Sequence, residues 1–171
     1  MADDDLADFC RDVWPRLVGS LSLYLGRRDL AEEIAQEALV RVCQRWRSVR
    51  NADSPAAWAH RVAFNLAKSH FRREATRRRV WARAVEPARI VHVDQVVGIA
   101  TRDALQSLPP AQRQALVLRY YADLSVRDVA ALMHCPENTV KTHTRRALER
   151  LRASGLLDDD VEESDITEDV G

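Results

Sequence analysis

The sequence predicts an all-α protein made of two small helical domains joined by a flexible linker. Apolar residues recur at three- or four-residue intervals through most of the chain, which is the spacing of one buried helix face. No segment shows the alternating apolar and polar residues that are typical of a half-buried strand. Helical periodicity fades over residues 84–98, which include Pro87 and Gly98, so we expect the linker there.

Three helices are expected in the N-terminal half. The first should end near Gly26 and be kinked or interrupted at Pro15, and the second should begin at Asp29. After a polar loop from Arg47 to Asp53, Ser54-Pro55 marks the start of the third. The inward positions are Leu6, Phe9, Val13, Leu17, Leu21 and Leu25 in the first helix, Leu30, Ile34, Ala38, Val42 and Trp46 in the second, and Trp58, Ala59, Val62, Ala63 and Leu66 in the third.

The C-terminal half should hold a helix from Ile99 to Ser107, another ending near Tyr121, and a closing pair between residues 125 and 151. Ser125 is placed to cap the first helix of this pair, with Asp128 as its reciprocal partner. Pro136 suits the first turn of the second helix, where a missing N–H has no intrahelical partner. Two helices separated by so short a break predict a helix-turn-helix.

The last helix has one apolar side and one side rich in hydrogen-bond donors. The apolar side consists of Val140, Ala147, Leu148 and Leu151, and the polar side of Asn138, Thr139, Lys141, Thr142, Arg145 and Arg146. A helix fits the major groove of B-DNA, where arginine and lysine bond guanine and asparagine pairs with adenine. This pattern favours DNA recognition over the alternative of a solvated amphipathic helix.

Charge is strongly segregated along the chain. The formal net charge of zero combines acidic ends with a body, residues 9–157, that carries +12, and such a body suits a polyanion. Cys10, Cys43 and Cys135 are far apart and outside any CxxC pattern, so neither a disulfide framework nor a zinc site is expected. With no signal peptide or membrane-spanning run in the sequence, we expect a cytoplasmic protein without membrane insertion. The histidines are scattered and the sequence contains no Gly-rich phosphate loop, so we expect neither catalysis nor a bound cofactor.

Four segments together resemble the extracytoplasmic-function (ECF) group of bacterial RNA polymerase sigma factors, and within this group they are similar to the short actinobacterial SigE family. They are AEEIAQEALVRV at 31–42, WAHRVAFNLAKSHFRR at 58–73, SLPPAQRQALVLRYYADLSVRDVAALM at 107–133 and HCPENTVKTHTRRALERLR at 134–152. The resemblance covers most of the chain. It implies sigma region 2 at residues 1–83 and sigma region 4 at 99–153, on either side of the linker expected at 84–98. The remaining residues, 154–171, are acidic and poor in aromatic residues, a composition that predicts a disordered tail.

For region 2, the resemblance implies two contact surfaces. The outward face of the second helix would bind the β′ clamp of core RNA polymerase through Glu32, Glu33, Gln36, Glu37 and Arg41; the alternative is a solvated charged face. The third helix would read and melt the −10 element through Trp58, Arg61, Asn65, Lys68, Arg72 and Arg73. Asn65 is the expected partner of a flipped base. Trp58 is at least as well explained as a core anchor. The basic run from Arg72 to Arg83 would follow the DNA phosphates, with a solvated helix end as the alternative.

For region 4, the resemblance implies recognition of the −35 element by Asn138, Thr139, Lys141, Thr142, Arg145 and Arg146, with Arg127 contacting phosphate from the preceding helix. His143 departs from the family pattern, in which arginine is common at this position. The resemblance also implies docking on the β flap through the helix from Gln112 to Tyr121, and control by an anti-sigma factor that no residue here identifies. The competing interpretation is a helix-turn-helix transcriptional regulator that acts without replacing sigma, which accounts for residues 107–152 only.

Overall fold

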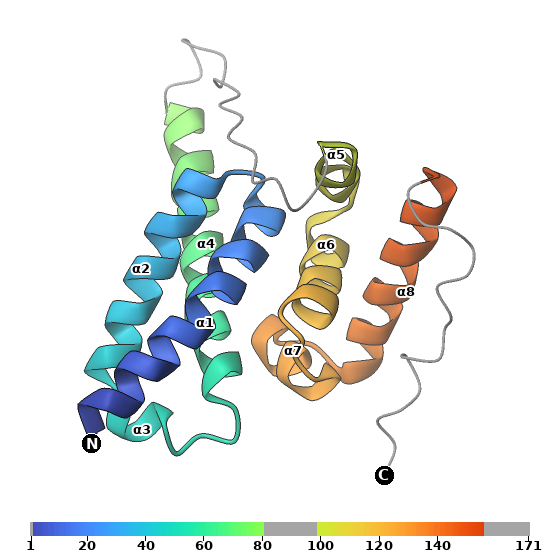
Figure 1. Ribbon diagram of the computed structural model, residues 1–171. Helices are drawn as coiled ribbons and strands as arrows, with labels where there is room; N and C mark the ends of the chain where they lie inside the picture. The colour runs from blue at the N-terminus through green and yellow to red at the C-terminus, as the bar shows by residue number, and fades with distance from the viewer. Residues whose placement is uncertain (1, 81–98, 156–171) are drawn as a thin grey trace. The chain divides into compact units, whose positions relative to one another are not determined.

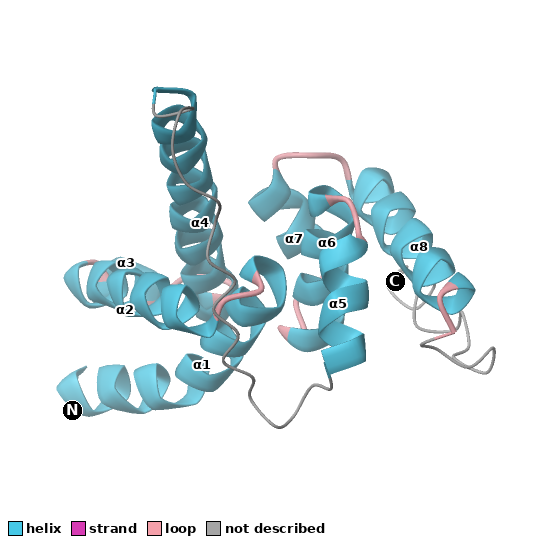
Figure 2. Cartoon of the chain, turned by 90° about the horizontal axis from the view of Figure 1, so that it is seen from above, coloured by secondary structure: helices cyan, strands magenta, loops and turns pink. Residues whose placement is uncertain are grey.

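The computed structural model describes residues 2–80 and 99–155, and every regular element in these two ranges is helical (Figures 1 and 2). The chain divides into an N-terminal unit, residues 1–93, and a C-terminal unit, residues 94–171. The prediction of an all-α protein with two helical domains is confirmed. The expected linker and the expected acidic tail lie outside the described residues, apart from Ser154 and Gly155.

The N-terminal unit is a bundle of three long helices and one short one. Helices α1 (Ala2–Leu25), α2 (Arg28–Gln44) and α4 (Pro55–Val80) pack against one another, and α3 (Trp46–Val49) follows α2 (Figure 1). Gly26 ends α1 with a φ of 72°, which lies in the left-handed region that glycine adopts without steric cost. At the start of α4 the Ser54 hydroxyl accepts the Ala57 N–H at 3.1 Å, as an N-cap does.

Two expectations for this unit were wrong in part: the interruption of the first helix and the loop after the second. Helix α1 is not interrupted at Pro15, which is exposed, while Val13 and Leu17 on the opposite side are buried and hold both halves of the helix on the core. The segment from Arg47 to Asp53 is not all loop, because its first three residues complete the short helix α3. Trp46 begins that helix instead of ending α2, and its ring lies 5.1 Å from that of Phe9.

The C-terminal unit contains α5 (Ile99–Ser107), α6 (Pro110–Leu116), the π-helical turn η1 (Val117–Tyr121), α7 (Val126–Met133) and α8 (Glu137–Ala153). Helix α8 packs on both α6 and α7. Helix α6 continues into η1, where Ala122 N–H bonds the Val117 carbonyl five residues back at 3.0 Å, so the expected helix to Tyr121 ends in a widened turn. The core of this unit includes Leu118, Leu132 and Val140.

Candidate nucleic-acid interface and docking face

The turn between α7 and α8 is fixed by local hydrogen bonds and one left-handed residue. Ser125 caps α7, accepting the Asp128 N–H at 3.0 Å. His134 ends α7 with a φ of 55°, and the Cys135 N–H then bonds the Ala130 carbonyl at 3.1 Å. Pro136 is extended and precedes α8, so its expected place inside the first helical turn was off by one residue. The chain therefore reverses within three residues, as a helix-turn-helix requires.

Helix α8 presents its predicted polar residues on the side opposite its core. Val140, Thr144, Ala147, Leu148 and Leu151 are buried. Of the predicted DNA contacts, Arg127, Asn138, Arg145 and Arg146 are exposed, and Thr139, Lys141 and Thr142 are half-buried. Two of these residues are engaged within the helix: the Thr142 hydroxyl donates to the Asn138 carbonyl at 2.8 Å, and Arg145 pairs with Glu149 at 2.6 Å. The face therefore offers cations and amide groups on one rigid helix.

One face of α4 carries a row of polar residues spaced for a single side of a helix. Trp58, Arg61, Asn65, Lys68 and Arg72 follow at alternating intervals of three and four residues. Arg61, Asn65 and Arg72 are exposed, whereas Ala59, Ala63 and Phe64 on the other face are buried. Arg72 and Arg73 both bond Ser69 in the preceding turn, through its hydroxyl at 3.2 Å and its carbonyl at 3.4 Å respectively. Arg61, Asn65 and Arg72 thus lie on solvent along one continuous helix, whereas Trp58 and Lys68 are half-buried.

Trp58 belongs at least in part to the core. It is half-buried and packs against the cluster formed by Val13, Val42, Val49 and Ala59. These contacts favour its interpretation as an anchor between helices over one in which the indole stacks on a base.

The outward face of α2 is acidic and partly paired. Glu33, Gln36, Glu37 and Arg41 are exposed and Glu32 is half-buried. Within the helix, Arg28 pairs with Glu32 and Arg41 with Glu37, each at 2.7 Å. Both pairs are exposed enough that solvent screens them, and they add little to stability. Each pair places one carboxylate of this face beside an arginine of the same helix.

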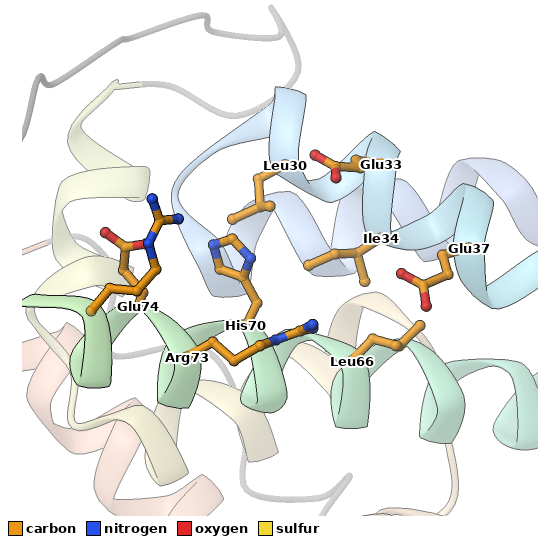
Figure 3. A pocket seen from close by; sticks show the side chains of 9 residues that line it. Leu30, Glu33, Ile34, Glu37, Leu66, His70, Arg73 and Glu74 are labelled. Atoms are coloured by element: carbon orange, nitrogen blue, oxygen red, sulfur yellow. The ribbon is translucent and has the colours of Figure 1, made fainter.

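A pocket of about 300 Å³ separates this face of α2 from α4 (Figure 3). Leu30 and Ile34 of α2 and Leu66 and His70 of α4 lie between the two helices, with the charged side chains of Glu33 and Glu37 on α2 and of Arg73 and Glu74 on α4 around them. The lining residues are Leu30, Glu33, Ile34, Glu37, Leu66, His70, Arg73, Glu74 and Arg77. The pocket therefore includes Glu33 and Glu37 of the acidic face on α2, but none of the residues of the polar row on α4.

Sequence reasoning missed two features of the N-terminal unit. His60 is buried on α4 with its Nδ1 at 2.9 Å from the Ala56 carbonyl, and burial lowers the pKa of its imidazole. Cys10 and Cys43, distant in sequence, interact through their side chains. Neither feature has a local sequence signal, because both depend on how separate helices pack. Among the described residues no helix is long and apolar enough to cross a membrane, and no three potential ligands converge to hold a metal ion.

Comparison with known proteins identifies both units. The family model for Sigma-70 region 2 matches residues 9–77, and that for Sigma-70 region 4 matches residues 99–151. The chain is 30% identical over 165 residues to the ECF RNA polymerase sigma factor EcfG of Rhodopseudomonas palustris, covering 90% of this chain and 88% of the relative. It is 27% identical over 152 residues to the RNA polymerase sigma-H factor of Pseudomonas aeruginosa, covering 80% and 78%.

A solved structure has the same fold. The sigma factor RpoE from Bartonella quintana, determined in complex with the anti-sigma factor NepR, superposes with a TM-score of 0.80 at 23% identity, over 90% of this chain and 98% of that one. Both sigma regions are thus present in their family order, each with its expected helices. The chain belongs to the extracytoplasmic-function sigma factors of bacterial RNA polymerase.

Proposed function

We propose that this sigma factor binds core RNA polymerase in the cytoplasm and directs promoter-specific initiation by reading a −35 duplex and a melted −10 strand. The observation that carries the proposal is the presence of both matched regions in one chain, each with a polar helix face exposed to solvent. The chain acts without catalysing a reaction, since polymerase supplies the chemistry. A regulator that uses the helix-turn-helix alone leaves residues 9–77 without a role and is not favoured.

Core binding is assigned to the acidic face of α2, formed by Glu32, Glu33, Gln36, Glu37 and Arg41, with the β′ clamp as its partner. Exposure of most of this face supports the assignment. Charge complementarity with a basic partner accelerates association and fixes register. The β flap would hold the C-terminal unit through the segment from Gln112 to Tyr121.

Reading of the −10 element is assigned to Arg61, Asn65, Lys68, Arg72 and Arg73 of α4. An amide side chain donates and accepts hydrogen bonds at the edge of a flipped base, and the cations bind the backbone. Exposure of Arg61 and Asn65 on a face away from the core supports these roles. Trp58 enters this assignment as the residue that holds the start of α4 on the core, because it packs there.

Reading of the −35 element is assigned to α8. Lys141, Thr142, Arg145 and Arg146 would enter the major groove, with Asn138 and Thr139 at the leading end of the helix. Arg127 on α7 would hold a phosphate. The helix-turn-helix geometry supports this docking, because the N-terminal residues of the second helix contact base edges in that arrangement.

An anti-sigma factor is proposed as the regulator. The support is that the structurally similar RpoE was solved bound to one. The acidic face of α2 is the surface that such a protein would cover to exclude polymerase.

The decisive experiment reconstitutes the chain with core RNA polymerase and sequences the 5′ ends of run-off transcripts. We expect starts at a fixed distance from a shared pair of upstream elements, and none without the chain. Random starts, or specific duplex binding by the chain without any effect on core polymerase, would contradict the proposal.

Two variants, each with a matched control, test core binding and strand opening separately. Glu33→Lys should weaken core binding, while Asp12→Lys, an equally exposed acid on α1, should leave it unchanged. Asn65→Ala should preserve core binding and abolish strand opening detected by permanganate reactivity. Thr76→Ala, also exposed on α4, should leave opening intact.

A further inference from the structure

Two cysteines meet where α1 packs on α2. Cys10 follows Phe9 in α1, and Cys43 in α2 lies three residues before Trp46; the Phe9 and Trp46 rings are 5.1 Å apart. Val13, three residues after Cys10, and Val42, directly before Cys43, belong to one hydrophobic cluster. Packing of these flanking residues therefore brings the two cysteines to the same part of the contact between α1 and α2.

The thiols interact directly and differ in exposure. Cys10 is half-buried and bonds the side chain of Cys43, which is exposed. Burial, then the charge of a Cys43 thiolate and this hydrogen bond, raise the pKa of Cys10 to about 11. Cys135 lies in the C-terminal unit, with no second cysteine among the residues of that unit. Two cysteines in contact across two helices meet the first requirement for disulfide formation, which is proximity.

We propose that Cys10 and Cys43 form a reversible thiol–disulfide pair that is oxidised by hydrogen peroxide and ties α1 to α2. The Cys43 sulfur attacks one peroxide oxygen and the O–O bond breaks, which gives a Cys43 sulfenic acid and, after proton transfer, water. The Cys10 sulfur then attacks the Cys43 sulfur. The S–O bond breaks, and the departing hydroxide takes the Cys10 proton. Two thiols and one peroxide become one disulfide and two waters.

The difference in exposure sets the order of these steps. Cys43 is the sulfur that solvent reaches, so it meets the oxidant first. Cys10 is half-buried beside it and acts as the resolving thiol that attacks the Cys43 sulfenic acid. Disulfide formation spares Cys43 from the irreversible sulfinic and sulfonic acids.

The disulfide would stabilise the N-terminal unit. A bond between residues 10 and 43 closes a loop that contains most of α1 and nearly all of α2, and so restricts the unfolded chain. Cys43 also lies on the same side of α2 as Glu32 and Gln36, by the helical repeat. Oxidation therefore acts at one end of the acidic face described above.

The test uses the full reduced chain, one equivalent of hydrogen peroxide, and alkylation of the remaining thiols before proteolysis and mass spectrometry. We expect a crosslinked peptide pair containing Cys10 and Cys43, two hydrogens lighter than the sum of its parts and restored by dithiothreitol. Thermal unfolding of the oxidised chain should shift upward by on the order of 10 °C.

Three single substitutions keep the outcome interpretable. Cys135→Ser should still form the crosslink and show the thermal shift. Cys10→Ser should lose both and accumulate a dimedone-reactive sulfenic acid at Cys43. Cys43→Ser should lose both and leave Cys10 largely reduced. Equal oxidation of all three thiols without a Cys10–Cys43 crosslink would overturn the proposal, as would a predominant crosslink between chains.

Discussion

The side chains of Ser125 and Asp128 are bonded to each other at the first turn of α7. The Ser125 hydroxyl accepts the Asp128 N–H at 3.0 Å and donates to the Asp128 carboxylate at 2.8 Å. This differs from the usual capping box, in which the second side chain accepts the backbone N–H of the cap. Here the Asp128 carboxylate accepts the Ser125 hydroxyl proton, which leaves a lone pair of the Ser125 oxygen directed at the Asp128 N–H.

Ser125→Ala should destabilise the C-terminal unit by about 1 kcal/mol, because the Asp128 N–H loses its partner at the helix start. Urea denaturation followed by circular dichroism measures the change. Ser125→Thr, which keeps the hydroxyl, should recover most of it. Equal stability of the alanine variant and the parent chain would show that solvent replaces the cap.

Phe64→Ala should destabilise the N-terminal unit by about 3–5 kcal/mol, because Phe64 is fully buried and packs 5.1 Å from the ring of Tyr24. Phe71→Ala is the matched control: its ring lies 6.1 Å from the same tyrosine but is 43% exposed. Chemical denaturation of both variants should show a much smaller loss for Phe71→Ala. Similar losses would contradict the placement of the core.

Stability of the N-terminal unit should fall as the pH is lowered below 6.5. Burial, followed by the charge of Arg16, lowers the pKa of His60 from its ordinary value of 6.5, so the folded chain keeps this imidazole neutral. The unfolded chain binds the proton first, which favours unfolding between 6.5 and the lower folded pKa. Urea midpoints at pH 7.5 and 5.5 should differ more in the parent chain than in His60→Gln. Identical pH dependence in the two would exclude His60 as the cause.

Glu149→Gln should strengthen promoter binding by the holoenzyme. Arg145 pairs with Glu149 at 2.6 Å, and both side chains are 51% exposed, so the pair contributes little to stability. Its loss frees Arg145 for a DNA phosphate and should steepen the logarithmic dependence of affinity on salt by about one. Fluorescence anisotropy across a salt series measures the slope. An unchanged slope would mean that Arg145 reaches no phosphate.

Local sequence signals predicted the helices whose ends carry a cap or a stop. Ser54 and Ser125 begin α4 and α7 as expected, and Gly26 ends α1. These positions were predictable because a hydroxyl cap or a left-handed glycine acts on its own turn. The outward positions of Asn65 and Arg146 also followed from helical periodicity, but their roles in DNA binding stay predictions.

Features set by tertiary contact were not predictable. Helix α3 forms in a polar segment because Trp46 and Val49 pack on a core that includes Val13 of α1. The cysteines look isolated in the sequence, because helix packing and not sequence spacing brings Cys10 close to Cys43. The widened turn η1 likewise has no composition signal that distinguishes it from the end of an ordinary helix.

The unbroken course of α4 from Pro55 to Val80 limits how much DNA the proposed −10 row can read. From Arg61 to Arg72 this row spans about 17 Å at 1.5 Å per residue, the length of about five stacked nucleotides. A rigid helix has a fixed length that does not adjust to the promoter. Substitutions along it can change which bases are preferred. A longer recognition sequence would require additional helical turns.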